Sequence, residues 1–181
     1  MTRRILTAAL MAAQMAALAL AGCDRAKERH PPPDPFAAPA AKAEAVAPTQ
    51  GLSKGLPKRS QLAGFSLDRI GAASDPLNRQ PAETPAARPI VLEGFGFDPV
   101  AKAPGKGVDV VVDGKPYGAA YGRARQDVAS YFKAPGLVNV GFTTTLPAAA
   151  LSPGAHTAAV RVVAADGKGY YEGLPIRFQV K

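Results

Sequence analysis

The sequence predicts an all-β fold over residues 61–181. Apolar residues recur there at every second position, which is the period of a strand with one buried face. Turn sequences such as Asp113-Gly114 and Ser152-Pro153-Gly154 separate these stretches. Glycine and proline, with 18 residues each, are too frequent for a helical bundle and suit turns and short strands.

We expect about seven strands in this region, as in a small β-sandwich. Aromatic and β-branched residues predict the first four, at residues 64–70, 90–97, 108–112 and 117–121. Alternation predicts the last three, from the apolar sets Val138, Val140, Phe142, Thr144 and Leu146; Ala158, Val160, Val162 and Ala164; and Leu174, Ile176, Phe178 and Val180. Pro116 cannot donate a ladder hydrogen bond and favours an edge position for the strand that follows it.

Strands of this kind need two sheets, because each sheet has one apolar face to bury. Short strands with frequent turns are typical of a single immunoglobulin-like β-sandwich. Tryptophan is absent and the single cysteine precludes a disulfide between the sheets, so antibody-type features are missing. A jelly roll or a small barrel is the alternative architecture.

One long run of sequence has a familiar pattern. VDVVVDGKPYGAAYGRARQDVASYF, followed by VGF, LSPGAHT and VRVVAADGKG, resembles an Ig-like module of bacterial envelope and surface proteins over residues 90–180. Gln126 stands where that module has proline, and Phe95 where it has tryptophan. The resemblance implies the fold but no particular activity, because such modules are accessories in many contexts.

Residues 1–22 are expected to be a signal peptide that is cleaved. Two arginines precede an apolar stretch that only Thr7 and Gln14 interrupt. The stretch is short for spanning a bilayer and matches a secretory signal followed by small residues. An uncleaved anchor, or an ordinary signal with a chance cysteine, is the alternative.

The signal ends in Leu20-Ala21-Gly22-Cys23, which resembles the lipobox of bacterial lipoproteins. In that family the cysteine thiol receives a diacylglyceryl group, a peptidase cuts before it, and the new amine is usually acylated. The resemblance implies a mature chain that starts at lipid-modified Cys23, the only cysteine. More than one acyl chain gives stable anchoring, since each buried methylene contributes about 0.8 kcal/mol. Asp24 resembles the inner-membrane retention signal of enteric lipoproteins and favours that membrane, with the protein facing the periplasm.

Residues 23–60 are expected to be the lipidated N-terminus and a disordered linker rich in proline and alanine. No apolar period of strand or helix type is present there, and proline biases the chain toward extended geometry. Such a linker would allow the domain at 61–181 to lie well away from the bilayer.

The net charge of +8 does not indicate a nucleic-acid binder. The excess is spread along the chain, with +2 in residues 1–23, +3 in 24–60 and +3 in 61–181. A nucleic-acid interface needs clustered positive charge, so no nucleic-acid partner is expected. One cysteine and two histidines exclude a disulfide framework and a Cys/His zinc site within one chain. No metal and no cofactor are expected.

Three features could carry catalysis or metal binding, and each has a structural interpretation. Gly51-Leu52-Ser53-Lys54-Gly55 matches the G-x-S-x-G pattern of hydrolases, but no strand–turn–helix context surrounds it. His156 lies at the start of a strand and has no His or Cys partner for a metal. Asp109 and Asp113 would share one face of a strand, but Asp113 belongs to a turn and no calcium loop is present.

Residues 121–132 interrupt the strands, and Asp127 is expected to cap one helical turn there. The segment also holds the most site-like cluster of the chain: Tyr121, Arg123, Arg125 and Tyr131. Arginine can hold a carboxylate or phosphate, and tyrosine can stack on a sugar ring. The favoured interpretation is a salt-bridged connector, in which Asp127 pairs with an arginine while Tyr131 and Phe132 fill the core. Ligand binding by the cluster is the alternative.

These observations predict a lipid-anchored protein of the bacterial cell envelope whose Ig-like domain is a non-catalytic interaction or accessory module. Its expected partners are the membrane, through the acyl chains, and an unknown envelope protein or polysaccharide. One alternative is a carbohydrate- or peptidoglycan-binding module that uses the Tyr121–Tyr131 connector. The other is an envelope enzyme.

The substitution Cys23→Ala tests the predicted anchor. It should abolish metabolic labelling with palmitate and release the protein from membranes, because no other thiol can accept the diacylglyceryl group. Ser60→Ala, outside the motif, should leave labelling unchanged. Labelling that persists in Cys23→Ala would contradict the prediction.

Overall fold

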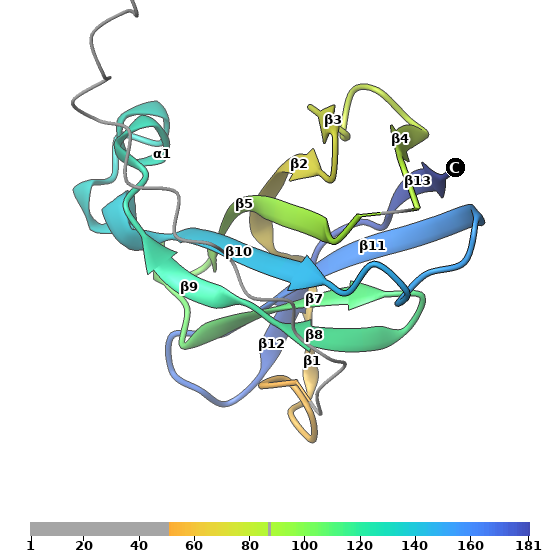
Figure 1. Cartoon of the computed structure of the whole chain (residues 1–181). Coiled ribbons are helices and arrows are strands. Elements are labelled where there is room, and N and C mark those ends of the chain that lie inside the picture. The colour runs from red at the N-terminus through yellow and green to blue at the C-terminus, as the bar shows by residue number, and fades with distance from the viewer. Residues whose placement is uncertain (1–50, 87) are drawn as a thin grey trace, which may run out of the picture. The chain divides into compact units, whose positions relative to one another are not determined.

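The computed structural model describes residues 51–86 and 88–181, in which most residues belong to β-strands arranged in two sheets (Figure 1). The fold class is therefore all-β, as predicted. Cys23, Asp24, the predicted signal and most of the predicted linker lie outside the described residues. None of the helices in the described part is long and apolar enough to cross a membrane.

The larger sheet has seven strands and is built around β11. This strand pairs with β7 along one edge and with β12 and then β13 along the other. Its strands are β1 (Lys58–Leu62), β4 (Ala82–Thr84), β7 (Gly107–Val112), β8 (Lys115–Gly118), β11 (Gly154–Val163), β12 (Tyr170–Glu172) and β13 (Ile176–Val180). The edge strands β1 and β4 pair in parallel with β12 and β13.

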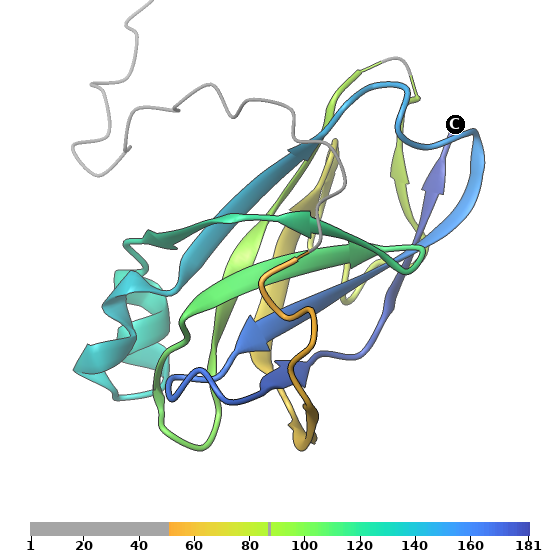
Figure 2. The ribbon, with the colours of Figure 1, turned by 90° about the horizontal axis from the view of Figure 1, so that it is seen from below.

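The smaller sheet has six strands, with β5 between β2 and β10. Its strands are β2 (Gly64–Ile70), β3 (Ala73–Ser74), β5 (Ile90–Asp98), β6 (Ala103–Pro104), β9 (Ala120–Arg123) and β10 (Gly141–Leu146). Figure 2 shows the two sheets as facing layers.

The chain passes from one sheet to the other within the segment predicted as a single strand at 117–121. Asp113 and Gly114 have φ angles of 48° and 79°, as a two-residue hairpin requires, and β8 returns along β7. After Ala119 the chain continues as β9, which pairs with β10 of the six-stranded sheet. Among the described strands β8 pairs with β7 alone, so the edge position predicted from Pro116 is confirmed.

One hydrophobic core lies between the sheets and takes residues from both. Its largest fully buried side chains include Leu92, Tyr117, Phe142, Tyr171 and Phe178. The predicted alternation is confirmed for β11, where Ala158, Val160 and Val162 are all inaccessible to solvent. Two layers with one shared core follow from the period of 2, because every strand turns its apolar residues to the same side.

A second hydrophobic cluster lies on the outer face of the six-stranded sheet. There the helix α1 (Gln126–Tyr131) and the 3-10 helix η1 (Pro135–Asn139) cover the end of β5. Val128 and Leu137 from the helices pack with Phe97 and Val140. A helix as short as α1 is not stable by itself, so this packing holds it in place.

Four predicted strand residues lie outside the strands. Val140 and Ala164 are buried and directly adjoin β10 and β11, whereas the other two lie elsewhere for local reasons. Val138 belongs to η1 rather than to β10, because Pro135 and Gly136 begin a helical turn before the strand. Leu174 was expected on the buried side of the last strand, but β13 begins only at Ile176 and Leu174 is 61% exposed.

The last ten residues of the predicted linker, 51–60, form part of the fold, so the prediction of disorder is wrong for them. Residues 51–56 form turns against β7, and β1 begins at Lys58 and pairs with β12. Sequence periodicity does not reveal this segment, because polar contacts to one buried side chain hold it.

That side chain is Asp109, whose neighbours Val108 and Val110 on β7 face the core. Asp109 therefore points to the outer face of the seven-stranded sheet. Its carboxylate is fully buried and accepts hydrogen bonds from the Leu52 N–H (2.9 Å), the Ser53 N–H (2.8 Å) and the Ser53 hydroxyl (2.7 Å). A carboxylate buried without such donors would be strongly destabilising, so β7 and residues 51–53 require each other.

The substitution Asp109→Ala should lower the free energy of unfolding by about 3 kcal/mol, because it leaves buried donors of residues 52 and 53 without an acceptor. Denaturant titration measures this loss, and limited proteolysis should show earlier cleavage at residues 51–57. Glu83→Ala is the control, since the ion pair of Glu83 with Lys181 is exposed and contributes little. Equal stability of the Asp109 and Glu83 variants would contradict the assignment.

Candidate functional site

A groove of about 350 Å³ lies beside α1 on the outer face of the six-stranded sheet. We call it the α1 groove, and its lining residues are Ser66, Phe95, Asp127, Val128, Tyr131 and Phe132. Ser66 and Phe95 are register partners across β2 and β5 and form the sheet side of the groove. The other residues come from α1 and its C-terminal end, which lies at one end of the sheet (Figure 1).

A chain of aromatic rings leads from the second hydrophobic cluster to the surface. The Phe97 and Phe132 rings meet edge to face with centroids 5.0 Å apart, and Phe132 meets Tyr131 in the same way at 5.0 Å. Phe97 is buried, Phe132 is 43% exposed and Tyr131 is 81% exposed. The groove therefore presents aromatic ring surface to solvent on a helix that is anchored beneath it.

Arg125 connects the groove to a smaller hollow on the same face. Its guanidinium forms two hydrogen bonds to Asp127 (2.6 and 2.9 Å) and one to Asp68 (2.6 Å), and lies 5.2 Å from the centroid of the Phe95 ring. The hydrogen bond from Arg125 lowers the pKa of the Asp127 carboxyl, and Asp127 in turn raises the pKa of Arg125. These groups are ionised and paired with one another.

The smaller hollow, of about 190 Å³, holds a second set of ion pairs. Asp68, Glu93, Arg123 and Arg125 contribute its charged lining. Glu93 pairs with Arg69 on one side (2.7 Å) and with Arg123 on the other (3.3 Å). Such exposed pairs contribute little to stability, so their arrangement can change at small cost when a ligand binds.

The structure brings three of the four predicted site residues to this face and turns the fourth away. Arg123, Arg125 and Tyr131 border the groove and the hollow. Tyr121 packs against the main core, where its hydroxyl donates to the Gly96 carbonyl (2.7 Å) and accepts from the Gly105 N–H (3.0 Å). Burial raises the pKa of Tyr121, and its hydroxyl ties β9 to β5 and to Gly105, which follows β6.

The favoured connector interpretation is confirmed in its ion pair and wrong in its packing. Asp127 pairs with Arg125 as expected. The predicted helix cap is wrong, because the N-cap residue of α1 is Arg125 rather than Asp127, and no side-chain hydrogen bond caps the helix. Val128 and Ala129 are the buried residues of α1, and Tyr131 is exposed.

Sequence reasoning did not assign Ser66, Asp68, Glu93 or Phe95 to this site. All four lie on β2 or β5, more than twenty-five residues before α1 in the chain. The sequence Gly94-Phe95-Gly96-Phe97 did contain one signal. Its two phenylalanines lie on the face of β5 opposite to the main core, and large apolar residues on that face indicate that another element covers it.

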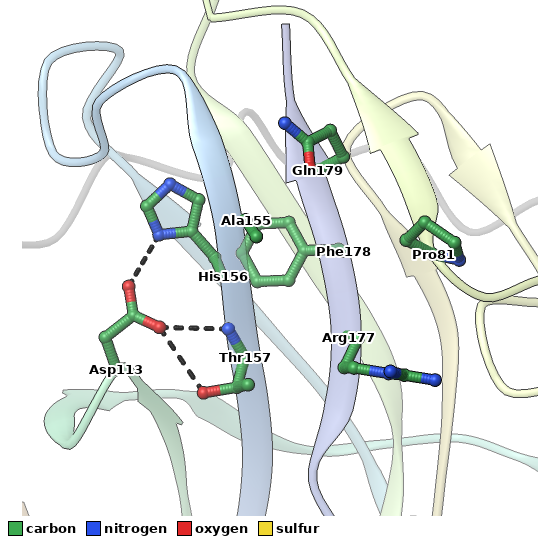
Figure 3. Close-up of a pocket in the computed structure, with 8 residues that line it drawn as sticks. All are labelled: Pro81, Asp113, Ala155, His156, Thr157, Arg177, Phe178 and Gln179. Carbon is green, nitrogen blue, oxygen red and sulfur yellow. Dashed lines mark hydrogen bonds and ion pairs between the residues drawn. The ribbon is translucent and has the colours of Figure 1, made fainter.

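A second hollow, of about 330 Å³, lies on the seven-stranded sheet around β11 and β13 (Figure 3). Here the ring of His156 lies beside Phe178, 5.5 Å between centroids, and its side chain is only 9% exposed. Its Nδ1 contacts Asp113 Oδ2 at 2.5 Å and its Nε2 contacts the Ser152 carbonyl at 2.8 Å.

Both ring nitrogens of His156 face acceptors, so both must donate, and only the imidazolium form can do so. Burial opposes this charge, but the contacts with Asp113 and Ser152 outweigh it and raise the pKa of His156. The pKa of Asp113 is lowered against burial by His156 and Thr157. His156 therefore fixes the 147–153 turn to the β7–β8 hairpin and has no free nitrogen for catalysis or a metal.

The other candidate groups are also engaged. Ser53 of the G-x-S-x-G match is 3% exposed and its hydroxyl donates to Asp109. Asp109 and Asp113 hold separate segments rather than one cation. Within residues 51–86 and 88–181, no three His, Cys, Asp or Glu side chains are grouped in a way that could hold a metal ion.

No protein-family model, curated protein or solved structure matches this chain. The site is therefore interpreted from its own chemistry. The α1 groove offers aromatic ring surface, ionised groups that neutralise one another and one aliphatic hydroxyl, that of Ser66. Such a surface can bind a partner through apolar contact and hydrogen bonds.

The contribution of His156 to stability should depend on pH. Since folding raises the pKa of His156, the contribution is full below about pH 6.5, the pKa of the unfolded imidazole, and is lost as the pH rises through the folded-state pKa. The lowered pKa of Asp113 sets the acidic limit, because the contribution is lost again as the pH falls through that pKa.

The melting temperature of His156→Gln should therefore lie further below that of the parent at about pH 6 than at about pH 9. Calorimetry at the two pH values measures the difference. Lys115→Gln is the control, because Lys115 lies exposed in the same hairpin as Asp113 and forms no ion pair with a described carboxylate, and it should melt like the parent at both pH values. A deficit for His156→Gln that is the same at both pH values would contradict the assigned ion pair.

Proposed function

We propose that this chain is an exported bacterial lipoprotein, anchored through acyl chains on Cys23, whose folded part is an immunoglobulin-like β-sandwich. The lipobox-like motif and the lone cysteine support the anchor. Two facing sheets with one shared core support the sandwich. Asp24 favours the inner membrane, with the domain in the periplasm.

The domain acts as a non-catalytic contact module, and the α1 groove is its contact surface. The single observation that carries this proposal is the exposure of Tyr131, 81% on a helix whose other face is anchored in a hydrophobic cluster. An exposed aromatic side chain with low conformational freedom is the residue type that dominates binding interfaces.

The charged groups of the groove support binding rather than chemistry. Asp127 and Arg125 neutralise each other, so neither is free to act as a base or to hold an anion by itself. Among the described residues no histidine lies beside the groove hydroxyl of Ser66, because His156 lies on the other sheet. A partner would therefore meet mainly ring surface, with the ion pairs at the border.

Site-specific photo-crosslinking tests the contact surface in cells. A photoreactive amino acid in place of Tyr131 should give crosslinked products in the envelope, whereas the same residue in place of Leu174 should give few. Leu174 is a matched control, because it is similarly exposed but lies between β12 and β13. Equal product patterns at the two positions would show that the α1 groove is not the contact surface.

A polysaccharide is the second candidate partner, because the groove is lined by aromatic rings on which sugar units can stack. Phe95, Tyr131 and Phe132 offer ring faces for sugar stacking, and the paired Arg125 and Asp127 offer hydrogen bonds to hydroxyls. Binding of the protein to isolated peptidoglycan that is lost in Tyr131→Ala would support this candidate.

A further inference from the structure

Four lysines at one end of the domain have no carboxylate within ion-pair distance in the described part of the chain. The α1 end, as we call it, comprises three neighbouring segments: 99–106, 131–134 and 164–169. They lie at the same end of the sheets in both ribbon views (Figures 1 and 2). The four exposed lysines are Lys102, Lys106, Lys133 and Lys168.

The carboxylates at this end are already engaged. Asp98 is buried and accepts hydrogen bonds from three backbone N–H groups, which joins the turn at 99–102 to Ala165. Asp127 pairs with Arg125, and Asp166 pairs with Arg59. Asp166 also attracts Lys168, but it is already paired with Arg59, so the α1 end carries an excess of positive charge.

Apolar side chains are exposed among these lysines. Val100 is 62% exposed in the turn that also carries Lys102, and Tyr131 and Phe132 directly precede Lys133. The turn at 99–102 follows Phe97, whose ring contacts Phe132. Two turns at the α1 end therefore each carry an exposed apolar side chain next to a lysine that forms no ion pair with a described carboxylate.

We propose that the α1 end docks onto an anionic phospholipid bilayer. Lysines near such a surface are attracted to its headgroups, and tyrosine favours the boundary between headgroups and acyl chains. The pattern fits a flat, charged surface better than a glycan strand, because the free charges lie on turn tips and not within the α1 groove. The inference rests on the proposed function, which brings the domain to a membrane and assigns contact to this end.

The start of the described chain agrees with this orientation. Leu52 packs against Gly107, where an added Cβ would lie 2.3 Å from Leu52 Cδ1, and Gly107 follows Lys106. The first described residue, Gly51, lies against Asp109 and Pro116 on the outer face of the seven-stranded sheet, and from there the Leu52 side chain reaches Gly107 beside Lys106. Anchor and docking surface act as two signals, which together hold a protein to a membrane more firmly than either does.

Vesicle co-sedimentation tests the proposal with the chain from residue 23 onward carrying Cys23→Ser, so that neither acyl chains nor the N-terminal apolar stretch can bind lipid. All described strands lie within this chain. It should bind vesicles of phosphatidylglycerol and phosphatidylcholine, bind pure phosphatidylcholine far less, and dissociate as salt is raised. Lys102→Glu and Lys133→Glu should each weaken binding about fivefold or more.

Tyr131→Ser should weaken binding to the mixed vesicles about tenfold, through loss of buried ring area. The matched controls are Lys115→Glu in the hairpin at the other end of β7 and Leu174→Ser, and both should bind like the parent. Circular dichroism of each variant checks that the fold is kept.

Three outcomes would overturn the proposal: no preference for anionic vesicles, equal losses for Lys115→Glu and Lys102→Glu, or binding to peptidoglycan but not to vesicles. The last outcome would leave the α1 groove as a contact surface for a glycan. Failure of the proposed function itself is recognised separately, because photo-crosslinking at Tyr131 would then give no more product than at Leu174.

Discussion

The buried carboxylate of Asp109 is the interaction on which the arrangement of the seven-stranded sheet depends. It lies in the middle of an otherwise apolar strand, β7, and hydrogen bonds from residues 52 and 53 compensate for its removal from water. These bonds fix residues 51–56 across the outer face of β7. The chain is then directed to the far edge of the sheet, where β1 pairs with β12 and Lys58 and Arg161 both reach Glu172. A polar group in a hydrophobic strand thus fixes residues 51–56 on the outer face of this sheet.

Apart from the α1 end, the polar and apolar side chains of the domain mainly serve to hold its own strands and turns together. The strands bury their apolar residues between the sheets, and His156 and Asp98 hold turns in place with contacts that occupy their own polar atoms. Helix α1 differs, because six residues cannot form a stable helix alone and only one side of it is packed. Val128 and the aromatic rings hold it against β5, and this anchoring is what presents Tyr131 to solvent in a fixed position.

Charge pairing separates the groups that stabilise from those that are free to recognise a partner. Arg125 and Asp127, which the sequence favoured as an ion pair over a ligand-binding cluster, neutralise each other at the border of the groove. The excess positive charge lies instead on lysines in turns, where no sequence motif draws attention to them. An even distribution along the chain becomes a local excess at one end, because folding brings turns at 99–106, 131–134 and 164–169 together.

The sequence by itself determined the all-β class, the buried sets on β11 and β13, the hairpin at Asp113-Gly114 and the edge position of β8. These features are local, since alternation and turn chemistry act over a few residues. Only the tertiary structure decided that residues 51–60 belong to the fold, that Tyr121 points inward while Tyr131 is exposed, and that β2 and β5 complete the α1 groove. Each of these depends on contacts between segments distant in the chain, such as Asp109 with Ser53, and no pattern within either segment records its partner.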